Sequence, residues 1–558
     1  MTGCIHKIKV AAKPLILLLM KKNWELIVLI FLIGANLFLS VQLYEAKSDG
    51  FFAPHGDSVP RAIISYGIAT GWDFPSASIF KYWKIEGIFP HKVWPPFQFY
   101  FNAVVYKISG NLLLSPVISN CIFSIGIIVI LYLLIRVMIP DRSILALTGV
   151  LIYITFAGFK MIDLSGLDQT MLNFFLIGGL YLWLKYRSSR GKRVFIYLSA
   201  IFFLIASSVR FEGWFCVGIF EVFILGEFLS SLRMRFREIT INSHENPDMA
   251  DQHRSFQPSV RCPAKYYLLS VMLIPLLFII LWLIHQQLAY GEFFFLNYHH
   301  SEAIAGGDKL YWDKSFIFKL LYYPVLLFKS SPILVSIIML SLCCIKKYNR
   351  ISRGYFYFIL IEFAILISSL LYVGAPHGTT RIIVTNLLLL LPITIAGLYY
   401  FLSVILRERM ALGLTVLVFI LISIFQFINI PQNLHNSISS EVSQIGYLMR
   451  KSVANGTIGK GDHIFVEVTN RQPWGIWDTQ KLSLFAPRFA VSMPPLFFDS
   501  DSLEKQKTTL EKRKIIFAVV WSEAARERLS KLFSRIYDTA HYSVFIRPDR
   551  VQPVEEYK

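Results

Sequence analysis

Charged residues are scarce in this sequence. Asp, Glu, Lys and Arg make up 16% of its 558 residues, whereas 55% are hydrophobic. Soluble domains are about one quarter charged, so this composition excludes an ordinary soluble protein and predicts a polytopic membrane protein. The net charge of +19 does not indicate a nucleic-acid-binding protein. The basic residues form short clusters between apolar runs and not one compact patch.

Cysteine is also rare, and its six occurrences do not form a disulfide framework. Those in apolar runs are Cys121, Cys216, Cys343 and Cys344, and those in segments expected to be cytoplasmic are Cys4 and Cys262. No Cys and His residues have the spacing of zinc ligands, so no metal site is predicted. The segments expected outside the membrane lack cysteine, although disulfides could form there. This absence favours a prokaryotic plasma membrane.

Long apolar runs, in contrast, are abundant. The first run is Leu26–Leu43, and the others lie at about 112–135, 144–161, 170–186, 194–209, 214–231, 266–287, 330–345, 355–374, 382–405 and 411–429. They predict roughly eleven transmembrane helices. Lysines precede the first run and every alternate loop is basic, which predicts a cytoplasmic N-terminus. An odd number of spans then puts everything after Ile430 on the outer side.

Three parts follow from this pattern: a basic cytoplasmic N-terminus (1–23), a transmembrane domain (24–429) with a large first outer loop (45–110), and an extracytoplasmic domain (430–558). The last part alternates helix-like and strand-like segments, which predicts an α/β domain. Its expected helices are Glu441–Lys451, Leu503–Lys512 and Glu523–Phe533, and its expected strands are His463–Val468, Ile515–Val520 and Tyr542–Ile546. The half-apolar stretch Phe316–Phe328 contains Lys319 and is expected to be a re-entrant or interfacial helix.

The first outer loop holds the leading candidate for catalysis, Asp57. A carboxylate at the membrane surface can act as general base on an acceptor hydroxyl within hydrogen-bond reach. The alternative is a solvated aspartate that caps the helix expected to begin near Ser58. Further along, Pro95 and Pro96 lead into the aromatic segment Phe97–Phe101, which is expected to lie at the interface between lipid and water.

Two further aspartates, Asp163 and Asp168, lie in the short outer turn between the third and fourth expected spans. Either could face a cavity shared with Asp57. The alternative for Asp168 is a structural one, because an aspartate at the start of a helix caps it and interacts favourably with its dipole.

Arginine at the outer ends of spans is the last unusual feature. Arg210 and Glu212 interrupt an apolar stretch, and Arg381 follows His377 in the short turn before the tenth span. The positive-inside rule leaves outer ends poor in arginine, so both arginines stand out. The planar guanidinium suits a phosphate, which predicts a clamp for a lipid-linked phosphate. The alternative is an Arg–Glu pair that only ends a helical hairpin.

Taken in order, these motifs resemble the GT-C type membrane glycosyltransferases, in particular the protein mannosyltransferase and aminoarabinose transferase branch that uses polyprenyl-phosphate sugars. The resemblance covers residues 24–405. It rests on Asp57, Pro95–Tyr100, Lys107–Gly110, Asp168–Gln169, Arg210–Trp214, Gly291–Phe294 and Arg381. Members of this family often carry an Asp-Glu pair in the first loop, whereas Ser58 follows Asp57 here.

The resemblance implies transfer of a sugar from a polyprenyl-phosphate donor to an acceptor hydroxyl of a lipid, glycan or protein, by an inverting single displacement at the outer face of the membrane. It implies Asp57 as catalytic base, Asp168 as a second acid, and Arg210 and Arg381 as ligands of the donor phosphate. The supporting residues would be Glu212, His377, Asp163, Pro95 and Pro96. A divalent metal ion could assist, but the sequence does not require one.

Two other functions stay open. A transporter or flippase of a lipid-linked saccharide would usually show internal repeats and spans broken at midplane, and the sequence has no evident repeat. A scaffold whose outer domain binds a partner protein would leave Arg210, Glu212 and Arg381 without a purpose.

Overall fold

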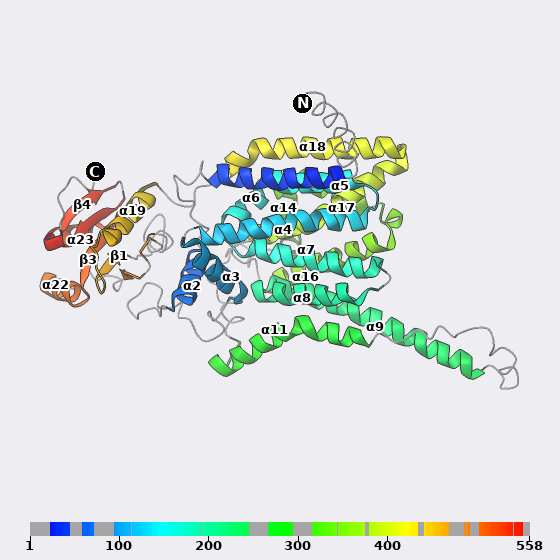
Figure 1. The fold of residues 1–558 in the computed structure, drawn as a ribbon, viewed down its shortest axis with the longest axis horizontal. Helices are drawn as coiled ribbons and strands as arrows, with labels where there is room; N and C mark the ends of the chain where they lie inside the picture. Colours follow the sequence, from blue (N-terminus) through cyan, green and yellow to red (C-terminus); the bar gives the residue numbers. More distant parts are fainter. Residues whose placement is uncertain are drawn as a thin grey trace, which may run out of the picture.

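The computed structural model describes residues 23–44, 58–71, 94–112, 114–189, 191–244, 266–293, 315–342, 344–373, 379–433, 440–467, 482, 485–486, 488–491, 502–539 and 541–550. Two predicted site residues, Asp57 and His377, lie outside these ranges. The described chain forms a bundle of long helices with a small α/β domain beyond one end (Figure 1). We call this end of the bundle the domain end.

The bundle consists of helices that correspond to the apolar runs of the sequence. They are Asn23–Tyr44, α4 (Ser115–Met138), α5 (Ser143–Thr155), α6 (Ala157–Leu164), α7 (Gln169–Ser188), α8 (Arg193–Val209), α9 (Glu212–His244), α11 (Tyr267–Tyr290), α14 (Phe316–Ser330), α15 (Pro332–Leu342), η3 (Ile345–Lys347), α16 (Arg350–Val373), α17 (Thr379–Ile405) and α18 (Glu408–Asn433). Among the described residues, seven helices are long and apolar enough to cross a membrane, or up to nine if each of two bent pairs is one span. The chain is therefore an integral, multi-pass membrane protein.

The two bent pairs have local causes. Helices α5 and α6 meet at an angle of 61° across Phe156, whose backbone is extended (φ −79°, ψ 118°), where the sequence predicts one unbroken span. Helices α14 and α15 meet at 112°. Pro332 starts α15, and a residue that precedes proline is disfavoured in helical conformation, so Ser331 ends α14. The second bend is compatible with the re-entrant segment predicted at Phe316–Phe328.

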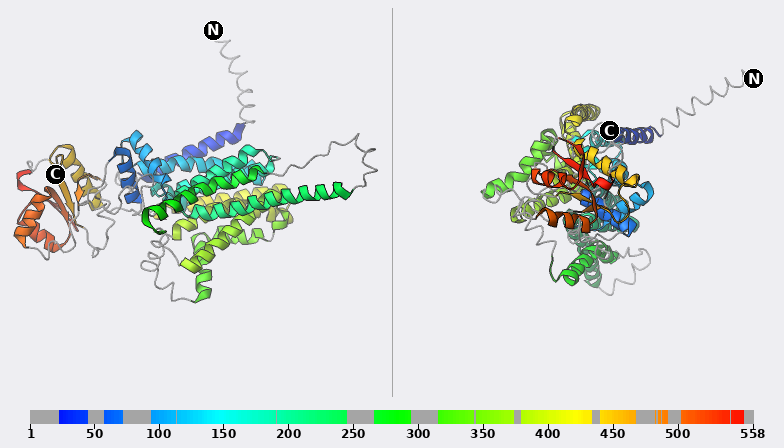
Figure 2. Two further views of the ribbon diagram at one scale, coloured as in Figure 1. Left: turned by 90° about the horizontal axis from the view of Figure 1, so that it is seen from below. Right: turned by 90° about the vertical axis from the view of Figure 1, so that its left-hand side faces the viewer.

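Close packing of α4, α7 and α8 gives the bundle its rigid centre. Helix α7 lies beside both α4 and α8 in the bundle (Figures 1 and 2). The three helices carry much of the main apolar cluster. Glycines allow the close approach: a Cβ atom at Gly126 would lie 2.3 Å from the ring of Phe174, and one at Gly178 would lie 2.4 Å from the ring of Phe202. Small residues at helix contacts are typical of membrane proteins, because lipid offers no hydrophobic force that would press helices together.

Two short helices, α2 (Ser58–Thr70) and α3 (Phe97–Ser109), lie at the domain end and pack against each other. Helix α3 starts after the buried Pro95 and Pro96 and ends at Gly110, which has the left-handed backbone (φ 65°) common after a helix. Phe97 and Phe101 of the aromatic segment pack on the bundle. Phe97 meets Phe175 at 5.3 Å between ring centroids, and Phe101 meets Phe123 at 4.8 Å.

The C-terminal domain is an α/β domain, as predicted. Its strands are β1 (His463–Val466), β2 (Ala490–Val491), β3 (Ile515–Val520), β4 (Ser534–Asp538) and β5 (Ser543–Ile546), in the sheet order β2-β1-β3-β5-β4. Strand β1 is parallel to β2 and β3, whereas β5 is antiparallel to β3 and β4. The remaining elements are α19 (Ser440–Ala454), α22 (Leu503–Lys512), α23 (Glu523–Ser530) and η4 (Pro548–Arg550). All six residues of β3 are buried, so both faces of the sheet are covered there.

Candidate functional site

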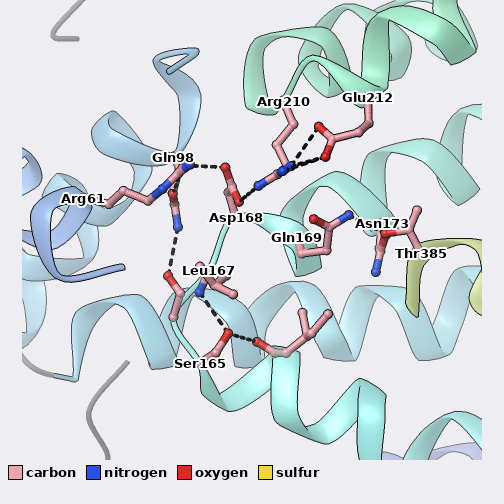
Figure 3. A network of polar contacts seen from close by, with 12 residues as sticks. Arg61, Gln98, Ser165, Leu167, Asp168, Gln169, Asn173, Arg210, Glu212 and Thr385 are labelled. Carbon is pink, nitrogen blue, oxygen red and sulfur yellow. Dashed lines mark hydrogen bonds and ion pairs between the residues drawn. The ribbon is translucent and has the colours of Figure 1, made fainter. Parts of the chain in front are cut away.

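A cluster of charged side chains lies at the domain end, centred on Asp168 (Figure 3). Asp168 stands at the N-cap position of α7, but its side chain makes no cap hydrogen bond, and it is only 1% exposed. One carboxylate oxygen accepts from Nη1 of Arg210 at 2.7 Å, and the other accepts from Nη1 of Arg61. The capping alternative for Asp168 therefore does not describe its side chain, which is an ion-pair centre.

The turn that presents Asp168 is itself held by hydrogen bonds. Gly166 has a left-handed backbone (φ 69°), which allows the tight reversal between α6 and α7. Asn120 of α4 donates to the carbonyl oxygens of Ile162 and Leu167, at 3.2 and 2.9 Å. The carboxylate is thus positioned by the backbone of its own turn and by a neighbouring helix.

Arg61, in the first turn of α2, was not among the residues singled out from the sequence. Its Nη1 also donates to Oε1 of Gln98 at 2.9 Å, and Nε2 of Gln98 donates to the carbonyl of Gly166 at 3.0 Å. Its guanidinium lies 4.3 Å from the ring centroid of Trp94, which is a cation–π contact. Arg61 therefore ties both short helices to the turn of Asp168.

Arg210 and Glu212 form the charged pair that the sequence indicates between α8 and α9. Nε of Arg210 donates to Oε2 of Glu212 at 2.9 Å, and Nη2 donates to Oε1 at 2.6 Å. Glu212 is the first residue of α9, where the helix dipole favours a negative charge. Since Arg210 also reaches Asp168, the pair does more than end its own hairpin.

The charges of the described residues in this cluster do not balance. Burial acts to raise the pKa of Asp168, but the positive charges of Arg210, Arg61 and Arg381 outweigh it and hold the pKa below its ordinary value. Three guanidinium groups therefore act on a cluster that holds two carboxylates, Asp168 and Glu212. Among these five described groups, all ionised, one positive charge is left over, which suits an anionic ligand.

Arg381 belongs to the first turn of α17 and is 9% exposed. One turn further along α17, Thr385 accepts a hydrogen bond from Gln169 and donates to Oδ1 of Asn173 at 2.8 Å (Figure 3). These bonds fix α17 against α7. The bonds of Thr385 therefore explain why Arg381, more than two hundred positions after Asp168 in the sequence, acts on its carboxylate.

Asp163 lies in a different network, although it is five residues from Asp168. It is 2% exposed, and it accepts from Oγ of Ser124 at 2.8 Å, from the hydroxyl of Tyr153 at 3.1 Å and from Oγ1 of Thr170 at 3.1 Å. Nζ of Lys160 completes the set at 3.3 Å. All of these groups lie inside the bundle, so its described contacts are those of a saturated structural carboxylate.

The described residues contain no group of three or more His, Cys, Asp or Glu side chains that could hold a metal ion. Asp57, the predicted base, directly precedes α2 in the chain. It stands four residues before Arg61, and four residues span at most about 14 Å. Of the predicted set, the described contacts bring together Asp168, Arg210 and Glu212, and Arg381 acts on Asp168 through its charge. Pro95 and Pro96 follow Trp94 in the chain.

Comparison by sequence identifies no relative: no family model and no curated protein matches the chain. Comparison of structures does. The chain is similar to ArnT from Cupriavidus metallidurans bound to undecaprenyl phosphate, with a TM-score of 0.55 over 93% of this chain and 98% of that one, at 12% identity.

A second similar structure is the archaeal oligosaccharyltransferase AglB from Archaeoglobus fulgidus, in complex with an inhibitory peptide and a dolichol-phosphate. Its TM-score is 0.48 at 12% identity, over 96% of this chain and 75% of that one. The likeness to ArnT extends over nearly the whole of both chains, and the chain therefore has the fold of the GT-C glycosyltransferases, as the order of its motifs predicted.

Proposed function

We propose that the chain is a membrane glycosyltransferase that moves a sugar from a polyprenyl-phosphate donor to an acceptor hydroxyl. The domain end of the bundle would face the outer side of the membrane. The observation that carries the proposal is the arginine-rich cluster around Asp168, built on a fold shared over its full length with an enzyme whose structure holds undecaprenyl phosphate. Undecaprenyl phosphate is the lipid part of such a donor.

Arg210 and Arg381 are the proposed ligands of the donor phosphate. Guanidinium groups bind phosphate oxygens through paired, charge-assisted hydrogen bonds. Arg210 already lies between two carboxylates, Asp168 and Glu212, which keep it oriented, and Arg381 acts on Asp168 through its charge. The excess positive charge of the cluster would then be neutralised by the phosphate.

The proposed reaction is a single displacement with inversion. An acceptor hydroxyl oxygen attacks the anomeric carbon of the donor sugar, and the bond between that carbon and the phosphate oxygen breaks. Asp57 takes the proton of the hydroxyl. The bonding electrons leave with the polyprenyl phosphate, whose charge is stabilised by the arginines. Phosphate is a good leaving group, so no general acid is needed.

Asp168, in its ionised form, is proposed to fix the positions of the Arg61 and Arg210 guanidinium groups. Its low pKa supports this role, because a permanently charged carboxylate is a poor proton shuttle but a good anchor for two guanidinium groups. A divalent ion near Asp57 is compatible with the mechanism, and no step of it depends on one.

The test is release of sugar from a panel of radiolabelled polyprenyl-phosphate sugars by the purified protein. We expect the wild type to consume at least one donor, Asp57→Asn to lose most of that activity, and Asp538→Asn, at an exposed position of the α/β domain, to retain it. A wild type that neither binds nor consumes any donor contradicts the proposal. Movement of the lipid across vesicles without sugar release would favour a flippase instead.

A further inference from the structure

The middle of helix α2 is enclosed on every side, although it lies beyond the membrane-spanning helices. All seven residues from Arg61 to Gly67 are buried. With 3.6 residues per turn, seven consecutive positions point in all directions around a helix. A helix that only rested on the bundle would leave one face exposed, so a second body contributes to covering α2.

That second body is the C-terminal domain. Ala62, Ile63 and Tyr66 of α2 belong to one apolar cluster with residues of the α/β domain. The members from that domain include Val442, Ile445 and Met449 of α19, together with Leu482, Phe485 and Ala486. Figure 1 shows α2 at the end of the bundle that carries the domain. Helix α2 is therefore packed between the membrane bundle and the α/β domain.

Tyr66 is the residue at which the two bodies meet. Its ring lies edge-on to the ring of Tyr106 in α3, at 5.4 Å between centroids. The guanidinium of Arg488 lies over the same ring, 5.5 Å from its centroid. Burial raises the pKa of the Tyr66 hydroxyl, and the positive charge of Arg488 acts against this rise. Arg488 thus contacts α2 directly from the C-terminal domain.

The segment that carries Arg488 is anchored in its own domain. Three residues earlier, the ring of Phe485 stacks against α19 so closely that a Cβ atom at Gly446 would lie 2.3 Å from it. The rings of Phe485 and Tyr447 are 5.6 Å apart. Because Arg488 belongs to a segment packed on α19 and contacts Tyr66, the position of α2 is tied to that of the C-terminal domain.

Helix α2 depends on such support. It has 13 residues, and isolated helices of this length are marginal in water. Its first turn carries Arg61, which binds Asp168, and Asp57 directly precedes it. A displacement of about 1 Å at reacting groups can lower a rate by about 100-fold. A small shift of α2 would therefore move both the proposed base, Asp57, and Arg61, which binds Asp168.

We propose that the C-terminal domain is a clamp that holds α2 against the bundle, with Tyr66 and Arg488 as positioning residues that keep Arg61 on Asp168. The clamp gives the α/β domain a role in the proposed transfer reaction, on which this part of the inference rests. Neither residue needs to touch donor or acceptor.

The test uses the full-length protein in detergent and two separate readouts. One is amide hydrogen exchange across Ser58–Thr70, and the other is kcat and KM for the polyprenyl-phosphate sugar that the wild type consumes. The variants are Arg488→Gln, Arg488→Lys and, as a matched control, Arg535→Gln, which removes an exposed arginine of the same domain.

Exchange in α2 should rise about threefold in Arg488→Gln, the scale of an exposed cation–π contact, while exchange in α19 and β3 stays unchanged. The value of kcat should fall about tenfold with KM nearly constant, because reacting groups are misplaced while the donor still binds. Arg488→Lys, which keeps a cation over the Tyr66 ring, should restore both exchange in α2 and kcat to near the wild-type values. Arg535→Gln should match the wild type.

Unchanged exchange in α2 of Arg488→Gln overturns the clamp. A rise spread over the whole α/β domain also overturns it, because the effect would then be general destabilisation. If exchange in α2 rises in Arg488→Gln but kcat is unchanged, the C-terminal domain has no role in sugar transfer. If the wild type consumes no donor, the proposed function fails, while a rise confined to α2 still supports the clamp.

Discussion

Asp163, near the end of α6, and Asp168, at the N-cap position of α7, stand five residues apart and are both almost fully buried, yet their surroundings differ in kind. Asp163 accepts hydrogen bonds from three hydroxyl groups and pairs with one lysine, so its charge is balanced and its oxygens are occupied. Asp168 is bound by two arginines, and a third acts on it from α17. The first carboxylate is saturated, whereas the described groups around the second keep an excess of positive charge.

We propose that this difference separates a structural acid from a functional one, which residue type and burial alone do not do. A carboxylate whose partners all belong to the bundle holds helices together. A carboxylate that orients more positive charge than it neutralises prepares a site for another anion. Four variants or conditions would test this contrast, beginning with the largest expected effect.

Replacement of Asp168 by asparagine should lower sugar transfer about 10²–10³-fold, the usual cost of losing one preorganised electrostatic group. Arg61 and Arg210 would lose the carboxylate that both of them bind. Initial rates at saturating donor measure the effect, and the melting temperature in detergent shows whether the variant is folded. If the variant folds and transfers sugar at wild-type rates, Asp168 is a structural residue, as Asp163 is.

Replacement of Arg61 by lysine keeps the charge but removes the planar guanidinium that serves Asp168, Gln98 and Trp94 together. We expect kcat to fall about tenfold, equivalent to ~1.4 kcal/mol in the barrier. Steady-state kinetics measure it. Arg142→Lys, at the opposite end of α4 and α5, is the control and should change the rate little.

Replacement of Asp163 by asparagine should mainly reduce stability. Loss of one partner from a buried ion pair costs about 3–5 kcal/mol, because Lys160 keeps an uncompensated charge. The specific activity of the folded fraction should remain within about threefold of the wild type, since Arg61 and Arg210 are untouched. Thermal unfolding and rates per folded molecule measure the two effects. If the specific activity of Asp163→Asn were as low as that of Asp168→Asn, the two aspartates would not differ in function.

Acid should reveal the smallest effect. The pKa of Asp168 is lowered in the folded protein, so its ionised form stabilises the fold above the ordinary aspartate pKa of about 3.9. That contribution is lost as the pH falls through the lowered pKa. The difference in melting temperature between wild type and Asp168→Asn should therefore be constant at neutral pH and shrink below about pH 4. A difference independent of pH would show that the charge of Asp168 does not stabilise the fold.

Much of the fold follows from local patterns in the sequence. Apolar runs predicted the membrane helices, and alternating segments predicted β1, β3 and β5 of the α/β domain. Strand β4 was missed because Ser534–Asp538 lies at an edge of the sheet and is largely polar, so it lacks the apolar pattern of a buried strand. The break at Phe156 was missed because no proline marks it.

The site was predictable only in part. Arg210 and Arg381 stand out because outer ends of membrane helices are poor in arginine. Arg61 gives no such signal, since a basic residue in a large loop is ordinary, and its partner Asp168 is 107 residues away. Asp163 and Asp168 look alike in the sequence, because the hydroxyl groups and arginines that distinguish them come from other helices.

The central claim is that the cluster around Asp168 holds a lipid-linked phosphate, and binding of undecaprenyl phosphate tests it directly. Affinity would be measured for the wild type, Arg210→Gln, Arg381→Gln and the distant control Arg142→Gln. The account predicts that each of the first two substitutions weakens binding by about tenfold or more, the scale of a hydrogen bond to a charged group, while the control binds like the wild type. Equal affinity in all four proteins would contradict it.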